Sequence, residues 1–291
     1  MTFTVTETSG RVELADASAN SVVVIAPERG GMAVRFTVGG RDLFFMDEAT
    51  LLDPAANVRG GNPVLFPSPG RLDGDCWTHE GQERAMKQHG FARNLGWAVT
   101  EQETEDRASV TLILTSSDAT KALFPAEFRF ELTYTLRGTC LHIAQRIENT
   151  GDDPMRFGVG FHPYFQVDDK ASARIDTAAT RAFDNVTKKE IPFTGFDLTS
   201  REVDLHLLDH GATSSALTWG DGARLAINAS PEFTHWVVWT LEGRPFVCVE
   251  PWTCPGNALN TGDRLITLSS GETGLFWIDL TFAAVRLDAP E

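Results

Sequence analysis

The sequence predicts an all-β fold, a large antiparallel β-sandwich. Runs of β-branched and aromatic residues recur along the chain, and several alternate with polar residues at the period of two that a half-buried strand requires. Turn-forming pairs such as Gly39-Gly40 and Asp221-Gly222 separate these runs. No helical apolar stripe is sustained and no linker divides the chain, so residues 1–291 are predicted to form a single domain.

The strand signals, in chain order, lie at residues 21–31, 33–46, 109–117, 127–151 and 274–285. The segment 127–151 is the clearest, because apolar side chains alternate with polar ones on both sides of Arg137-Gly138-Thr139. This pattern predicts a hairpin in an antiparallel sheet with one buried face. Short helices are predicted only around residues 53–58 and 117–122.

The composition excludes several classes of function. Apolar residues make up 42% of the chain and charged residues 22%, which is enough to build a sizeable core. A net charge of −15 disfavours nucleic acid as a partner, because binding phosphates needs clustered Lys and Arg. We expect no leader peptide, no membrane span and reduced cysteines, and therefore a cytoplasmic protein.

Two rigid, polar segments interrupt the strand pattern. The first, residues 60–77, is rich in proline and glycine and places Arg71 after Pro69-Gly70, where its guanidinium could face either a ligand oxygen or solvent. The second, residues 86–97, places His89 before Gly90 and Arg93 among aromatic residues. A sugar site needs this mixture of donors and aromatic surface, although a loop histidine bonded to a backbone carbonyl explains His89 equally well.

Two further segments place titratable groups inside apolar strands. His162 lies within the aromatic run at residues 157–169, and a buried histidine there needs a partner, whether its role is structural or catalytic. Glu250 follows Val247-Cys248-Val249 and precedes Pro251, which is expected to end the strand. Unless Glu250 points out of the sheet rim, the loss of water beside Trp252 should raise its pKa toward that of a general base.

These segments together resemble one family. The motifs GGNPVLFP, HGFAR, FHPYF and VCVEPW, in this order and spacing, are similar to those of the aldose 1-epimerase (galactose mutarotase-like) superfamily. The likeness runs from about residue 20 to residue 283. It is strongest to the bacterial branch of aldose epimerase-like proteins that carry HGFAR and weaker to the branch that acts on glucose 6-phosphate. It implies a β-supersandwich with a shallow sugar cleft on one concave sheet.

The resemblance also implies a reaction and a role for each motif. The family interconverts the α and β anomers of aldoses without a cofactor or a metal ion. Glu250 matches the base that takes the proton of the C1 hydroxyl, and His162 matches the acid that protonates the ring oxygen. The implied sugar-binding residues are His89, Arg71, Arg93 and Trp252.

The resemblance leaves some questions open. The family's substrate-binding aspartate is placed at Asp209, with Asp204 as the second choice. The expected partner is an aldose, free or phosphorylated, and the protein is expected to be a monomer or a homodimer. A non-catalytic carbohydrate-binding or sensing protein on the same fold is the main alternative. A glycoside hydrolase would instead need a second carboxylate near Glu250.

Overall fold

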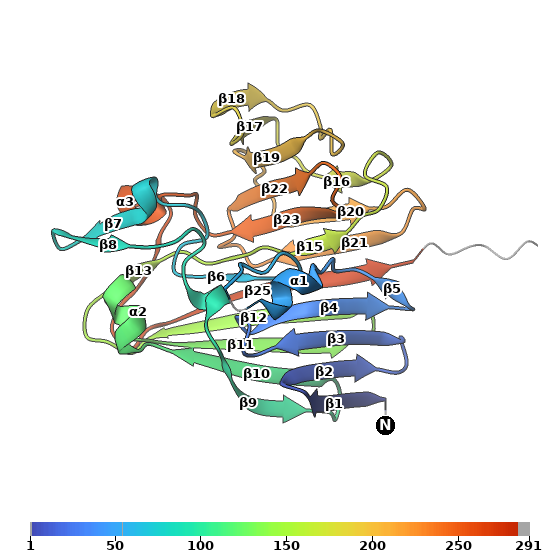
Figure 1. Ribbon diagram of the computed structural model, residues 1–291, viewed down its shortest axis with the longest axis horizontal. Helices are drawn as coiled ribbons and strands as arrows, with labels where there is room; N and C mark the ends of the chain where they lie inside the picture. The colour runs from blue at the N-terminus through green and yellow to red at the C-terminus, as the bar shows by residue number, and fades with distance from the viewer. Residues whose placement is uncertain (1, 54, 285–291) are drawn as a thin grey trace, which may run out of the picture.

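The computed structural model describes residues 2–53 and 55–284, and strands dominate it (Figure 1). One layer is an eight-stranded antiparallel sheet. Its strands, in spatial order, are β16 (Arg174–Asp176), β20 (Ser214–Thr218), β21 (Arg224–Ala229), β25 (Thr273–Ala283), β12 (Cys140–Asn149), β11 (Phe128–Arg137), β10 (Ala108–Thr115) and β9 (Ala98–Glu103). Figure 1 shows β10–β12 behind the N-terminal strands.

The opposite layer joins two sheets. The first is the five-stranded meander β1 (Phe3–Thr8), β2 (Arg11–Asp16), β3 (Ser21–Ala26), β4 (Met32–Val38) and β5 (Arg41–Asp42). The second runs β18 (Lys189–Pro192), β17 (Arg181–Asp184), β19 (Glu202–Leu207), β22 (His235–Leu241), β23 (Phe246–Trp252), β14 (Gly160–Phe161) and β6 (Val64–Leu65), with β15 (Tyr164–Gln166) also paired to β23. Single β-bridges such as Phe44 to Phe165 connect the two sheets.

The remaining elements are short. They are the hairpin β7 (Cys76–His79) and β8 (Gln82–Ala85), the pair β13 (Met155–Phe157) and β24 (Ile266–Leu268), the helices α1 (Glu48–Leu52), α2 (Asp118–Leu123) and α3 (Ala258–Thr261), and the 3-10 turns η1 (Asp73–Asp75) and η2 (Ala92–Asn94). None of the helices in the described part of the chain is long and apolar enough to cross a membrane.

The predicted all-β sandwich is confirmed, and so are its main strands. The predicted hairpin is β11–β12, where Arg137 pairs with Cys140 across a turn in which Gly138 has a φ of 60°. The helix expected at residues 117–122 is α2. The helix expected at residues 53–58 is wrong: α1 begins earlier, because the Asp47 side chain accepts a hydrogen bond from the Thr50 amide and caps the preceding turn.

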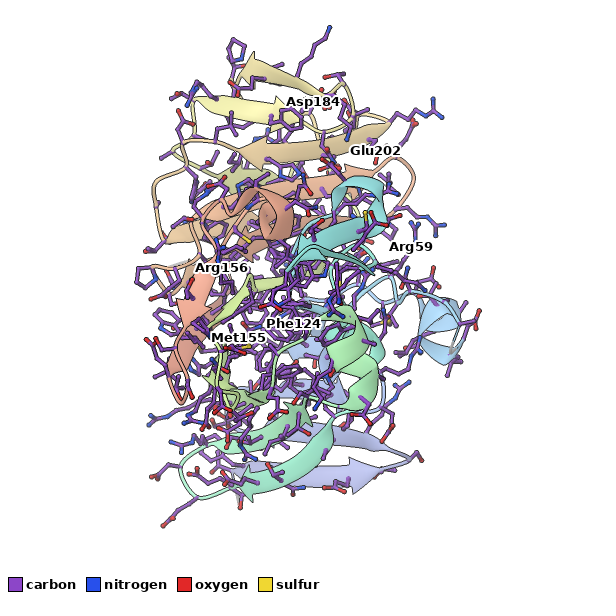
Figure 2. The ribbon with its side chains drawn as sticks, turned by 90° about the vertical axis from the view of Figure 1, so that its left-hand side faces the viewer. Arg59, Phe124, Met155, Arg156, Asp184 and Glu202 are labelled. Carbon is purple, nitrogen blue, oxygen red and sulfur yellow. The ribbon has the colours of Figure 1, made fainter. Side chains whose placement is uncertain are left out.

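The core lies between the two layers, and Phe66 is at its centre. The Phe66 side chain is fully buried, and its ring centroid lies 5.0–5.8 Å from those of several other phenylalanines. These are Phe91, Phe124, Phe128, Phe130 and Phe157. Figure 2 shows Phe124 among the side chains that fill this interior. The Phe66 carbonyl also accepts hydrogen bonds from the Phe91 and Ala92 amides, so the core fixes the start of η2.

Phe66→Ala should lower the free energy of unfolding by about 3–5 kcal/mol, because it removes buried surface and leaves a cavity among aromatic rings. Chemical denaturation monitored by tryptophan fluorescence measures this change. Val186→Ala, at an exposed position, is the matched control and should change stability by less than about 0.5 kcal/mol. Equal effects of the two substitutions would contradict the central role of Phe66.

Candidate active site

The alternation of side chains along β19, β22 and β23 separates the core from a cavity. Residues directly opposite one another in antiparallel strands share a face of the sheet. His206 pairs with Val237, and Val237 pairs with Glu250, so these three side chains lie on one face. Their neighbours along the strands, such as Val238 and Val249, belong to the buried core on the other face.

This face lines a polar cavity of about 1170 Å³. The register places two further rows on the same face, namely His235 opposite Trp252, and Trp239 opposite Cys248. Loops from the first third of the chain complete the cavity wall. They contribute Arg59, Arg71, His89 and Arg93.

Glu250 is the most deeply buried acid of the cavity, with 1% of its surface exposed. Its Oε1 lies 3.4 Å from His162 Nε2, and its Oε2 accepts a hydrogen bond of 3.2 Å from Trp252 Nε1. Burial raises the pKa of Glu250 well above its ordinary value, and the nearby Asp204 carboxylate raises it further. The Trp252 hydrogen bond and the Arg93 charge oppose this rise.

His162 lies between the short strands β14 and β15, where its ring stacks on Tyr164 with centroids 4.8 Å apart. Its ring also meets the edge of His89, with a centroid distance of 5.3 Å. Burial lowers the pKa of His162 well below its ordinary value, and the neighbouring His89 and Arg93 lower it further. Its Nδ1 is buried and has no hydrogen-bond partner among the described residues.

The strand that presents Glu250 does not end at Pro251, as the sequence suggested. β23 continues to Trp252, and Pro251 pairs with Trp236. The neighbour on the other side of β23 is itself broken, because β14 and β15 pair with it separately and His162-Pro163 lies between them. A proline without an amide donor is therefore tolerated at this position.

His89 has a strained backbone and a fixed orientation. Its φ is 70°, and Gly90 follows with a φ of 71°, at a position where a Cβ would collide with the Phe66 carbonyl oxygen. His89 Nδ1 forms a hydrogen bond to the Pro69 carbonyl oxygen, which can only accept. The proton is therefore on Nδ1, and Nε2 is an acceptor. Burial, with the Arg93 charge, lowers the pKa of His89 to about 3.

The two predicted arginines differ in their surroundings. The half-buried Arg93 donates a hydrogen bond of 3.1 Å to the Gln88 carbonyl, and its buried Nε has no partner among the described residues. Burial lowers the pKa of Arg93. Arg71 is exposed at the cavity rim and forms two hydrogen bonds of 2.9 and 3.0 Å with Asp75. Arg93 is therefore the less neutralised of the two.

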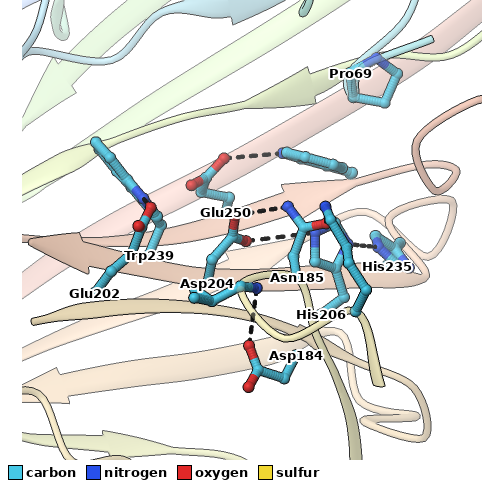
Figure 3. Close-up of polar contacts among 12 residues, drawn as sticks. Pro69, Asp184, Asn185, Glu202, Asp204, His206, His235, Trp239 and Glu250 are labelled. Carbon is cyan, nitrogen blue, oxygen red and sulfur yellow. Dashed lines mark hydrogen bonds and ion pairs between the residues drawn. The ribbon is translucent and has the colours of Figure 1, made fainter. Parts of the chain in front are cut away.

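Of the two aspartates that the sequence offers, Asp204 lines the cavity and Asp209 does not. Asp209 lies outside the cavity lining and accepts hydrogen bonds from the Thr180 amide and hydroxyl and from the Arg181 amide. These bonds hold the ends of neighbouring segments together and lower the pKa of Asp209 to about 2. Asp204 lines the cavity instead, where its Oδ2 accepts a hydrogen bond of 2.7 Å from Asn185 (Figure 3).

Sequence reasoning missed two histidines, His206 and His235. Both line the cavity, and His206 Nδ1 lies 2.8 Å from His235 Nε2. For His206 the available signal was alternation, because Glu202, Asp204 and His206 alternate along β19 with the apolar Val203, Leu205 and Leu207. β22 has no such alternation, because His235 shares its face with the apolar Val237 and Trp239, so no local signal marks His235.

A metal ion fits this site poorly. One ligand atom from each of His162, Cys248 and Glu250 lies within 4.8 Å of the others, and all three residues are buried. A metal would require both the thiol and the carboxyl group to lose their protons. Burial raises the pKa of Cys248 and of Glu250, which opposes that loss.

Comparison with known proteins places the chain in a family. The family model for aldose 1-epimerase matches residues 12–281, and the chain belongs to that family. The Slr1438 protein of Synechocystis sp. PCC 6803 is 34% identical, with a TM-score of 0.92 over 97% of this chain and 98% of that one. A galactose mutarotase-like protein from Clostridium acetobutylicum shares the fold, with 18% identity and a TM-score of 0.81 over 97% of this chain and 98% of that one.

Among curated proteins, a protein of Cenchrus ciliaris named "Putative glucose-6-phosphate 1-epimerase" is 30% identical over 52% of this chain. A protein of the same name from Salmonella typhimurium is 27% identical over 51% of the chain. Each match spans 46% of the relative's own length.

Glu250→Gln should raise the melting temperature at neutral pH, and the gain should grow as the pH rises. The folded-state pKa of Glu250 is raised, so the folded protein gains from the neutral acid below the unfolded pKa and loses that gain as the pH rises through the folded pKa. A glutamine cannot ionise. Differential scanning fluorimetry across pH measures the effect, with the exposed Glu105→Gln as the control. A wild-type protein more stable than the variant at high pH would contradict the raised pKa.

Proposed function

We propose that this protein is an aldose 1-epimerase that interconverts the α and β anomers of a sugar by opening and closing its ring. One observation supports this most directly. A carboxyl group and an imidazole face each other across 3.4 Å at the floor of a polar cavity, and their burial disfavours the charged form of each. Ring opening requires an acid and a base at two oxygens bonded to the same carbon, and such a pair supplies both.

The reaction assigns a role to each group. Glu250 accepts the proton of the C1 hydroxyl while the C1–ring-oxygen bond breaks, and its electron pair goes to the ring oxygen. His162 gives a proton to that oxygen, which leaves an open-chain aldehyde. Rotation about C1–C2 and closure on the other carbonyl face return both protons by the same steps. No net proton is gained or lost.

The protonation state of the pair suits this cycle. The neutral carboxylic acid with a neutral histidine holds the same number of protons as a carboxylate with an imidazolium. A shift of one proton from Glu250 to His162 converts the first state into the second, which is the form that starts the reaction. The Arg93 charge acts on both groups: it lowers the pKa of Glu250, which favours this shift, and it lowers the pKa of His162, which opposes it. His89 Nε2, as an acceptor, would bind a sugar hydroxyl.

The cavity also has groups for an anionic substituent. Arg59 is an exposed residue of the cavity lining, labelled in Figure 2, and no carboxylate pairs with it among the described residues. The names of the curated relatives contain glucose 6-phosphate. We therefore propose that the substrate class includes phosphorylated aldoses and that Arg59 binds the phosphate.

A second carboxylate in the cavity, Asp204, raises the glycoside hydrolase alternative. Its charge acts on Glu250, as a pair of catalytic carboxylates would. His162, however, is the group that faces Glu250 directly, which favours the epimerase.

Glu250→Gln should lower anomer exchange by about 100-fold or more, because it removes the base while keeping the shape of the side chain. Saturation-transfer NMR on free and 6-phosphorylated aldoses measures exchange, and titration calorimetry should show that the variant still binds the same sugar. If wild type exchanges no sugar but binds one, the carbohydrate-binding alternative replaces this proposal. If it instead releases nitrophenol from aryl glycosides, the hydrolase replaces it.

Arg59→Ala should lower kcat/KM for a 6-phosphorylated aldose about tenfold and leave the value for the free aldose nearly unchanged, because only the phosphate needs the charge. Arg35→Ala, on the exposed face of β4 outside the cavity, is the control. An equal loss for both substrates would show that Arg59 does not bind phosphate.

A further inference from the structure

A row of polar groups crosses one wall of the cavity and ends on Asp204. Arg264 Nη2 lies 3.4 Å from His235 Nδ1, and His235 Nε2 lies 2.8 Å from His206 Nδ1. His206 Nε2 in turn lies 3.5 Å from Asp204 Oδ1. Figure 3 shows the contacts from His235 through His206 to Asp204. The ring-opening chemistry proposed above uses neither histidine.

The chemistry of the two ends fixes the direction of this row. A guanidinium can only donate hydrogen bonds, so His235 Nδ1 must accept and the His235 proton lies on Nε2. That proton is donated to His206 Nδ1, which places the His206 proton on Nε2, facing Asp204. In the opposite set of tautomers, the His235 Nδ1–H would face an N–H of Arg264. The lone pair of His206 Nε2 would then face the Asp204 carboxylate.

The surroundings hold the row in this state. His235 is 3% exposed, and burial, with the charge of Arg264, lowers its pKa well below the ordinary value, so it is neutral. The Trp252 ring packs against both imidazoles, with centroid distances of 5.6 Å to His206 and 5.8 Å to His235. The same tryptophan donates to Glu250, so one side chain contacts both the row and the proposed base.

Arg264 is itself anchored. Its backbone has a φ of 53°, a left-handed conformation that is unusual for a residue with a side chain. Its guanidinium also donates to Asp263 at 3.3 Å and to the Thr234 carbonyl at 3.5 Å. These contacts direct the guanidinium at the residue that begins β22, His235.

We propose that Arg264, His235 and His206 form a one-way chain of N–H donors, whose last member faces Asp204 across 3.5 Å, and that this chain holds Asp204 as an acceptor for sugar hydroxyl groups. Asn185 supplies the donor to the other carboxylate oxygen, so each oxygen has one neighbouring donor, and Asp204 itself lines the cavity. Arg264, His235 and His206 are positioning residues that act through Asp204. This inference rests on the proposed function only for the identity of the ligand.

The tautomers can be measured without substrate. NMR of the intact protein with isotope-labelled histidine, assigned with the His206→Gln and His235→Gln variants, should show the proton on Nε2 of both rings. Arg264→Met should mix the tautomers of both rings, whereas Arg264→Lys, which keeps a donor-only group, should restore them at least in part. A proton on His235 Nδ1 in wild type, or tautomers unchanged in Arg264→Met, would overturn the proposal.

The kinetic consequence separates positioning from general damage. Arg264→Met should raise KM for the aldose about tenfold, the scale of one hydrogen bond, with kcat within about threefold, because Glu250 and His162 are untouched. Arg264→Lys should recover much of the KM. A fall in kcat at unchanged KM would overturn the assignment of the chain to sugar binding. If the predicted tautomers are found but no sugar is exchanged, the epimerase proposal fails and the donor chain is retained.

Discussion

The contact between Glu250 and His162 is the constraint on which the rest of the site depends. A carboxyl group in the middle of a buried strand resists ionisation, and a buried imidazole does too. The contact between the two groups offsets part of the free-energy cost of removing each from water, and it does so only while the side chains remain close. β23 must therefore be held rigidly against the β14–β15 segment. The β-pairing on both sides of β23 provides this rigidity.

The layers of the fold explain how a site with so many polar groups is stable. The apolar core lies between the two layers and includes Phe66, Leu132 and Val249, all almost fully buried. The polar cavity occupies the other face of the β19–β22–β23 sheet, so its polar side chains do not interrupt that core. Because the side-chain period of a strand is two, a single strand such as β23 can present Val249 to the core and Glu250 to the cavity.

The sequence predicted those features of the structure that lie within one continuous segment of the chain. The β11–β12 hairpin was readable because its alternation and its turn lie within one continuous segment. His162 and Glu250 were recognisable because each is a titratable residue in an apolar run. Asp204 was ranked below Asp209 because no local pattern says that β19 lies beside β22, which begins some thirty residues later in the chain. The contact between His206 and His235 depends on the same long-range pairing of strands, so no local pattern predicts it.

The pairing of β19, β22 and β23 also determines which side chains Trp252 contacts. The sequence placed it as a wall for the base and a contact for the sugar, and the structure adds two further neighbours. Its indole N–H reaches Glu250, while its ring contacts the imidazoles of His206 and His235. A displacement of this ring would alter both the acid–base pair and the orientation of Asp204. The proposed chemical step and the proposed recognition of the sugar hydroxyls are thus coupled through one aromatic side chain.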